Sequence, residues 1–101
     1  MTVVYYIGTK DQYTKDYELT ENYFERIITS EFIKEYPNGF TITTGTGYYK
    51  HNSGGVVTEK TYIVTVLDEV FVNRDLTDAL KDKLNQECIA VQVINDSAMF
   101  E

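Results

Sequence analysis

The residues best suited to chemistry gather in one short segment, GTGYYKHNSGGVV, from Gly45 to Val57. This segment holds the only histidine of the chain, His51. A histidine that acts as a general acid or base needs a partner to orient it, and Glu59 is the nearest carboxylate beyond the segment. The sequence therefore offers His51 and Glu59 as a candidate acid–base pair.

Aromatic and basic side chains in and around this segment favour binding over catalysis. The chain has nine tyrosines and no tryptophan, and tyrosine combines a ring that stacks with a hydroxyl that forms hydrogen bonds. Lys50 and Arg74 add cations that can hold an anionic group. The candidate ligand-binding residues are Tyr5, Tyr6, Thr43, Tyr48, Tyr49, Lys50, His51 and Arg74.

Known cofactor and metal motifs are missing from the sequence. The lysine of a phosphate-binding loop follows a glycine directly and opens a helix, whereas the glycines here lead from one strand to the next. One histidine and one cysteine are too few for a typical zinc site. We therefore expect no cofactor and no metal, and a protein that is more plausibly a binder than an enzyme.

Charge and cysteine content narrow the partners and the compartment. The net charge of −7 and the scattered lysines and arginines argue against general nucleic-acid binding. A single cysteine, Cys88, excludes an intramolecular disulfide, and we expect it to be a buried structural residue. The N-terminus shows no signal peptide and the chain no membrane span, so a cytoplasmic protein that does not contact membranes is expected.

Periodicity predicts four strands and two helices in the order β-α-β-β-α-β. Apolar residues recur at helical spacing between Tyr23 and Ile33, before the helix-stopping YPNG, and again between Leu76 and Cys88, after Asn73 or Asp75 as N-cap. The predicted strands are Thr2–Ile7, Phe40–Tyr49, Val56–Leu67 and Ile89–Ile94. This order is typical of a ferredoxin-like α+β fold, here a single domain of residues 1–101, with a four-stranded antiparallel sheet and both helices on one face. Right-handed crossovers place the first and third strands at the centre.

The sheet face without helices needs a cover. Alternate residues of the predicted strands, among them Tyr5, Tyr6, Thr41, Thr43 and Tyr62, form a surface too apolar to be left in water. A second copy of the chain or a ligand can cover it, and we expect both a homodimer and a pocket.

A family resemblance rests on the segment from Phe32 to Leu67. It resembles an uncharacterised family of small bacterial α+β proteins, a domain of unknown function, in which a helix ends in proline and a glycine, a hydrophobic residue and threonine open the next strand. A glycine, an aromatic residue and a looser turn then lead to valine and glutamate. The matching positions are Pro37, Gly39, Phe40, Thr41, Gly47, Tyr49, Gly55, Val57 and Glu59.

Three hypotheses for function follow. The leading one is a non-catalytic protein that binds or sequesters a planar or nucleotide-derived small molecule in an aromatic pocket near the Gly45–Val57 hairpin. One alternative is a small dimeric ferredoxin-like enzyme that uses His51 as acid or base. The other is an acidic protein–protein interaction module of a phage or mobile element, for instance an inhibitor that uses acidic helical faces against a basic target. A small, acidic, tyrosine-rich chain is also similar in type to the accessory and anti-defence proteins of phages.

Overall fold

The predicted order of helices and strands is confirmed. The computed structural model describes residues 1–10, 21–67, 73–86 and 88–95. The elements follow each other as β-α-β-β-α-β. Their bounds are β1 Thr2–Gly8, α1 Glu21–Glu35, β2 Thr41–Lys50, β3 Val56–Val66, α2 Arg74–Lys83 and β4 Ala90–Ile94.

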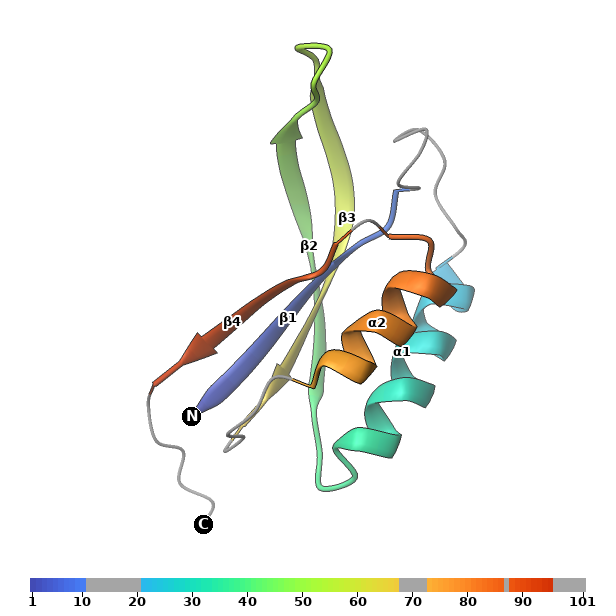
Figure 1. Cartoon of the computed structure of the whole chain (residues 1–101), viewed down its shortest axis with the longest axis vertical. Helices are drawn as coiled ribbons and strands as arrows, with labels where there is room; N and C mark the ends of the chain where they lie inside the picture. The colour runs from blue at the N-terminus through green and yellow to red at the C-terminus, as the bar shows by residue number, and fades with distance from the viewer. Residues whose placement is uncertain (11–20, 68–72, 87, 96–101) are drawn as a thin grey trace.

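The sheet has the strand order of a ferredoxin-like fold, β2-β3-β1-β4. All three neighbouring pairs are antiparallel, and β1 and β3 are the central strands, as predicted. Both helices lie on the same side of the sheet (Figure 1), while the β2–β3 hairpin extends beyond them. The opposite face, which we call the open face, is covered by neither of these two helices.

The core lies between the sheet and the helices because alternate side chains of the central strands point to them. In the pairing of β1 with β3, Val3 faces Val66, Tyr5 faces Val64 and Ile7 faces Tyr62. These six side chains are buried together with those of Phe24, Ile28, Phe32, Leu76, Leu80 and Leu84 from the two helices. The open face then receives the intervening residues of each strand.

Aromatic rings fill much of this core. The ring of Tyr5 meets that of Phe32 edge-on, with centroids 5.0 Å apart, and the rings of Phe24 and Tyr62 are stacked at 5.8 Å. The expectation that Tyr5 and Tyr62 belong to the surface opposite the helices is wrong, because both side chains are fully buried on the helix face. Tyr6, the neighbour of Tyr5, lies on the open face instead.

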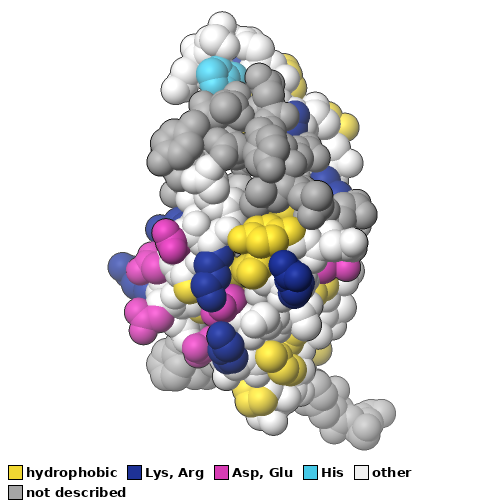
Figure 2. All heavy atoms as spheres, turned by 90° about the vertical axis from the view of Figure 1, so that its right-hand side faces the viewer, with side chains coloured by type: hydrophobic (Ala, Val, Ile, Leu, Met, Phe, Trp, Pro, Cys, Tyr) yellow, Lys and Arg dark blue, Asp and Glu magenta, His cyan; other side chains and the backbone are white. Residues whose placement is uncertain are grey.

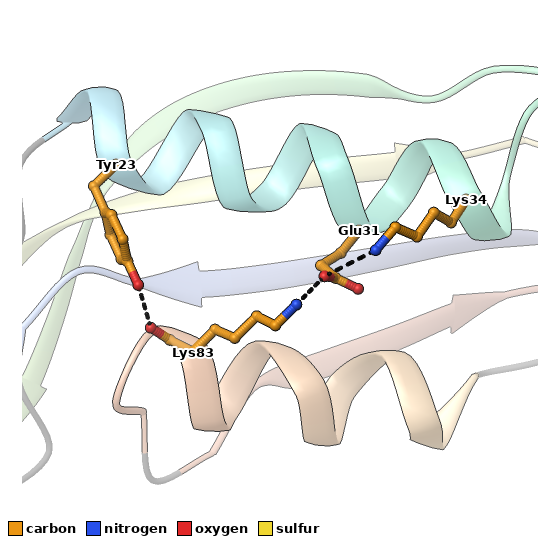
Figure 3. Close-up of polar contacts among 4 residues, drawn as sticks. All are labelled: Tyr23, Glu31, Lys34 and Lys83. Atoms are coloured by element: carbon orange, nitrogen blue, oxygen red, sulfur yellow. Dashed lines mark hydrogen bonds and ion pairs between the residues drawn. The ribbon is translucent and has the colours of Figure 1, made fainter.

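Polar contacts tie the two helices together along their length (Figure 3). The hydroxyl of Tyr23 in α1 donates to the carbonyl oxygen of Lys83 in α2 at 3.0 Å. The ammonium group of Lys83 in turn donates to the buried carboxylate of Glu31, which also lies 3.5 Å from the ammonium of Lys34. The hydrogen bond from Lys83 lowers the pKa of Glu31 below its ordinary value of 4.5, despite an opposing effect of burial.

The first turn of α2 begins as predicted, and the helix ends earlier than predicted. Asn73 is the N-cap, and its side-chain oxygen accepts from the backbone N–H of Leu76 at 3.1 Å. At the other end Leu84 is the C-cap and Asn85 has a left-handed φ of 52°. The expectation of Cys88 as a buried helical residue is therefore wrong: it follows the helix and is exposed.

Ile33 was expected on the apolar face of α1 and is 49% exposed. Counted at about 100° per residue, Ile33 lies roughly half a turn away from buried Phe24. The pattern of three- and four-residue steps ends at Phe32.

Charged side chains of both signs share the helix-bearing side of the molecule (Figure 2). Neither α1 nor α2 is long and apolar enough to cross a membrane, and the residues searched for such a helix were the described ones.

Candidate ligand-binding pocket

A pocket of about 500 Å³, here called the sheet pocket, lies where β1, β2, β3 and the start of β4 meet the residues that follow α2. Strand register places its main strand residues together on the open face, because Gly8 faces Thr61, Gly47 faces Glu59 and Tyr6 faces Ala90. The described residues that line it are Tyr6, Gly8, Lys10, Gly47, Tyr48, Tyr49, Glu59, Thr61, Gln86, Cys88 and Ala90.

Two glycines make the space in which the polar side chains of this pocket lie. A Cβ atom on Gly8 would come within 2.7 Å of the carboxyl carbon of Glu59. A Cβ atom on Gly47 would come within 2.6 Å of the hydroxyl oxygen of Thr61. Both distances are shorter than van der Waals contact, so any larger residue at either position would displace Glu59 or Thr61.

The carboxylate of Glu59 is held in place by backbone. Its Oε2 atom accepts a hydrogen bond from the backbone N–H of Lys10 at 3.0 Å. The carbonyl oxygen of Lys10 accepts from the side-chain amide of buried Gln86 at 2.8 Å, and the hydroxyl of Thr9 donates to the carbonyl oxygen of Lys60 at 2.8 Å. The segment that orients Glu59 is thus fixed to both β3 and the end of α2.

Aromatic side chains supply the apolar part of the pocket. Tyr6 projects from β1, and its hydroxyl donates to Oε1 of Gln92 in β4 at 2.9 Å. Tyr49 projects from β2, opposite Val57, and is partly buried. An aromatic ring that is only partly buried in a pocket offers its face to a flat ligand. The pocket therefore combines rings for stacking with a fixed carboxylate.

The structure brings some of the predicted binding residues together and separates others. Tyr6, Tyr48 and Tyr49 all line the sheet pocket. Tyr5 lies in the core, and its hydroxyl is 2.6 Å from that of Tyr36. Thr43 is on the open face but pairs with Ile63, further along the sheet and outside the pocket lining.

His51 has a partner other than Glu59. Its Nδ1 atom lies 2.8 Å from the hydroxyl of Ser53 and accepts from the backbone N–H of Ser53 at 3.1 Å. Both contacts belong to the turn between β2 and β3, which closes through the His51 N–H and the Gly55 carbonyl at 2.7 Å. His51 is not among the residues of the sheet pocket, and Glu59 contacts Lys10 there.

The two predicted cationic contacts also lie elsewhere. Lys50 is an exposed residue at the end of β2. Arg74, at the first turn of α2, borders a separate hollow of about 320 Å³ with Lys81, Ile89 and Val91 among its lining residues. Among the described residues, the basic side chain that lines the sheet pocket is that of Lys10, which sequence reasoning did not select.

A second pocket, of about 410 Å³, lies at the other end of β2. It is lined by residues 35–41 and 65–67. Two of its polar side chains already have partners: Glu35 accepts from the side chain of Asn73 at 2.6 Å, and the hydroxyl of Tyr36 contacts that of Tyr5. None of the candidate ligand-binding residues selected from the sequence lines this pocket, whereas Tyr6, Tyr48 and Tyr49 line the sheet pocket.

Sequence reasoning missed several of the described residues that line the sheet pocket: Gly8, Lys10, Thr61, Gln86, Cys88 and Ala90. Gly8 had a usable signal, because a glycine in a run of strand residues often marks a site where another group approaches the backbone closely. Lys10, Gln86 and Cys88 had none, since they reach the pocket from segments whose path depends on the tertiary fold.

Comparison with known structures supports the fold. A phage SAM lyase in complex with S-methyl-5'-thioadenosine superposes with a TM-score of 0.61 at 16% identity, over 89% of this chain and 76% of that chain. The periplasmic divalent cation tolerance protein CutA from Archaeoglobus fulgidus superposes with a TM-score of 0.60 at 20% identity, over 97% of this chain and 88% of that chain. No curated protein matches the chain.

The family comparison agrees with the resemblance drawn from the middle of the sequence. Three of the positions that carry that resemblance, Gly47, Tyr49 and Glu59, are brought together in the sheet pocket. The match to the family extends well beyond them, over residues 4–100. The chain therefore belongs to the family described as protein of unknown function (DUF3574).

Proposed function

We propose that this protein is a non-catalytic binder of a small planar ligand, nucleoside-like in shape, which occupies the sheet pocket. The observation that carries the proposal is the combination of Tyr6 and Tyr49 with the fixed carboxylate of Glu59 in one pocket of about 500 Å³. That volume is within the range of small-molecule sites, and few precisely placed polar groups among apolar ones are typical of them.

The size and chemistry of a nucleoside suit this pocket. A flat base can stack on a tyrosine ring, and hydroxyl or amino groups can donate to Glu59. The phage SAM lyase, which shares the fold, was solved with a thioadenosine bound. This likeness supports a ligand of the same general kind.

The proposal is for binding without catalysis because the predicted acid–base pair, His51 and Glu59, is not assembled in the pocket. Catalysis by His51 would require the imidazole to reach the ligand, and the ring contacts Ser53 in the hairpin turn instead. Among the described residues that line the pocket, Glu59 is the one carboxylate and Lys10 the one ammonium group. Such a pair serves recognition as readily as proton transfer.

Native mass spectrometry of the protein purified from its own host, followed by denaturation, tests the proposal. The wild type and the His51→Ala variant should release the same planar compound, and the double variant Tyr6→Ala, Tyr49→Ala should release none. An acid–base role would instead leave binding intact in His51→Ala while turnover of the released compound is lost. Recovery of a macromolecule and no small molecule would overturn the proposal in favour of the interaction module.

The proposal includes a homodimer. Support comes from the end of the hairpin, where Tyr48 is 70% exposed and Val56 is 71% exposed. The two residues lie on the same side of the hairpin, because Val56 pairs with Lys50, two residues after Tyr48, and adjoining exposed apolar side chains are more typical of interaction sites than scattered ones. Sedimentation velocity of the wild type and of a Tyr48→Ser, Val56→Ser variant tests this part: a dimer that becomes a monomer supports it, and a wild-type monomer contradicts it.

A further inference from the structure

We propose that Glu59 determines the specificity of the sheet pocket by accepting hydrogen bonds from the adjacent hydroxyls of a ribose. The pocket would then select ribonucleosides without phosphate groups over 2′-deoxynucleosides and nucleotides. This inference rests on the proposed function and goes beyond it, because it names the ligand class and the residue that recognises it.

The first support is the hydrogen-bonding capacity that the described residues leave on the Glu59 carboxylate. A carboxylate offers about four acceptor sites on its two oxygens. One of them, on Oε2, is taken by the N–H of Lys10. Among the described residues, the ion pairs join Glu31 and Asp78 to lysines and do not include Glu59. Within the described part of the chain, acceptor sites of Glu59 therefore remain for a ligand.

The second support is the position of that carboxylate against bare backbone. The Glu59 carboxylate occupies the place that a Cβ atom of Gly8 would take, and the Thr61 hydroxyl occupies that of Gly47, so both polar groups lie close to the sheet and line the pocket beneath the space for a ligand. The backbone contact with Lys10 fixes the carboxylate before a ligand arrives, which lowers the entropic cost of binding. A ligand that fills this space must bring hydrogen-bond donors.

Adjacent hydroxyls match this requirement. A carboxylate that accepts from ribose hydroxyls is the chemistry by which an acidic residue holds the sugar in dinucleotide-binding folds. With the ribose at Glu59, the base of the same ligand can lie against Tyr6 or Tyr49, which line the same pocket. The loss of one hydroxyl would leave an acceptor of a charged group unpaired.

Charge disfavours a phosphorylated ligand. Glu59 would repel a phosphate in the pocket, and the net charge of the chain, −7, adds to this repulsion at longer range. Lys10 also lines the pocket and can offset part of this effect. Lys50 and Arg74, the cations first considered for holding a phosphate, are not among the residues of the lining.

Isothermal titration calorimetry with adenosine, 2′-deoxyadenosine and adenosine monophosphate tests the inference. The wild type should bind adenosine about tenfold more tightly than 2′-deoxyadenosine, the usual effect of one hydrogen bond to a charged group, and more tightly than the monophosphate. In Glu59→Gln the preference for adenosine over 2′-deoxyadenosine should fall to about twofold or less, and that over the monophosphate should shrink. The amide oxygen of this variant can still accept from Lys10, so the local fold is retained.

The matched control is Glu25→Gln, which removes the same charge from an exposed position of α1. The Glu25→Gln variant should keep the wild-type preference for adenosine over 2′-deoxyadenosine and over adenosine monophosphate. Circular dichroism verifies that each variant is folded, and Glu59→Asp, which keeps the charge and withdraws the carboxylate by one methylene, replaces Glu59→Gln if that variant fails to fold. Glu59→Asp should likewise lose the preference for adenosine over 2′-deoxyadenosine.

The outcomes separate this inference from the proposed function. Equal binding of adenosine and 2′-deoxyadenosine by the wild type, or tighter binding of the monophosphate, overturns the inference and leaves a binding pocket. If the native protein releases a different planar compound and does not bind adenosine, the inference is likewise overturned and the binding pocket remains. A protein that releases and binds no small molecule contradicts both.

Discussion

Tyr5 and Tyr6 are neighbours in β1 whose side chains lie on opposite faces of the sheet. The hydroxyl of Tyr5 is buried in the core, 2.6 Å from the hydroxyl of Tyr36, and also accepts from the backbone N–H of Asn73 at 3.5 Å. The hydroxyl of Tyr6 donates to the exposed side chain of Gln92, and its ring lines the sheet pocket. One of the two residues serves the fold and the other the site.

Substitutions at these two positions should have opposite effects. Tyr5→Phe removes a buried hydrogen-bonding group, so the free energy of unfolding should fall by about 1–2 kcal/mol while ligand affinity is unchanged. Tyr6→Ala should weaken binding of the ligand about tenfold, as expected for the loss of a stacking aromatic ring. Urea unfolding and calorimetry measure the two quantities. Weaker binding in Tyr5→Phe, or unchanged binding in Tyr6→Ala, would contradict the assignment of the two faces.

Gly8→Ala should disturb Glu59 more than it disturbs the fold. The added methyl group would lie 2.7 Å from the carboxyl carbon of Glu59, and that side chain can swing away only by giving up its hydrogen bond to Lys10. We expect the free energy of unfolding to fall by about 1 kcal/mol and ligand affinity to fall about tenfold. Chemical denaturation and calorimetry check the two values.

Gly55→Ala is the control for this prediction. A Cβ atom at Gly55 would meet no atom within 4 Å, and its φ is outside the left-handed region, unlike that of Gly54 at 97°. Stability and affinity should both be unchanged within about 0.5 kcal/mol. If Gly55→Ala were as damaging as Gly8→Ala, the effect of Gly8→Ala could not be attributed to Glu59.

The pairing of Glu31 with Lys83 should make stability depend on pH in the acidic range. Since the pKa of Glu31 is lowered in the folded protein, chiefly by the hydrogen bond from Lys83, its contribution is complete above the ordinary carboxyl value of 4.5. The contribution is lost as the pH falls through the lowered pKa. Glu31→Gln should therefore be less stable than the wild type at neutral pH and closer to it at about pH 3.

Urea unfolding of the two proteins at both pH values measures this difference. The control is Glu25→Gln, a change on the same helix at an exposed residue. Its stability relative to the wild type should depend much less on pH. A constant difference between Glu31→Gln and the wild type at both pH values would show that the carboxylate charge of Glu31 is not what joins the two helices.

Cys88 should report occupancy of the sheet pocket. It is exposed, it lines the pocket, and it is the only cysteine of the chain, so a thiol reagent labels one site. Bound ligand should slow alkylation by N-ethylmaleimide several-fold by blocking access to the thiol. Mass spectrometry follows the rate with and without adenosine.

The Tyr6→Ala, Tyr49→Ala variant provides the comparison for this labelling experiment. Its alkylation rate should be the same with and without adenosine, because the variant lacks the rings that hold the base. If adenosine failed to protect Cys88 in a wild-type protein shown to bind it, the ligand would have to lie outside the sheet pocket.

The sequence was sufficient to predict the fold because each element has a local signal. Strand residues such as Val3, Val64 and Val66 are β-branched, the helices carry apolar residues at helical spacing, and Asn73 is a strong N-cap. The errors fell where local signals are ambiguous. Cys88 continued the helical spacing of α2 beyond Leu84, and only the left-handed residue Asn85 ends that helix.

The pocket was predicted in part. Tyr48, Tyr49 and Glu59 were selected from the hairpin, and Tyr6 from the first strand, because their chemistry is visible in sequence. The sequence did not predict on which face of the sheet Tyr5 lies, because a strand with apolar residues at every position shows no alternation of apolar and polar residues. The hydrogen bond from the backbone N–H of Lys10 to Glu59 depends on the path that the chain takes alongside β3 after the end of β1. No local sequence pattern specifies that path.

The turn at the tip of the β2–β3 hairpin determines which residues of the two strands face the sheet pocket. Its two backbone hydrogen bonds, from His51 to Gly55 and from Gly54 to His51, set the pairing that places Gly47 opposite Glu59. A single-residue insertion or deletion in β2 or β3 would exchange the two faces beyond that point and carry Glu59 toward the helix side. A length change in β2 should therefore be tolerated only together with a matching change in β3. Homologues whose hairpins differ in length by one residue should carry that difference in the turn.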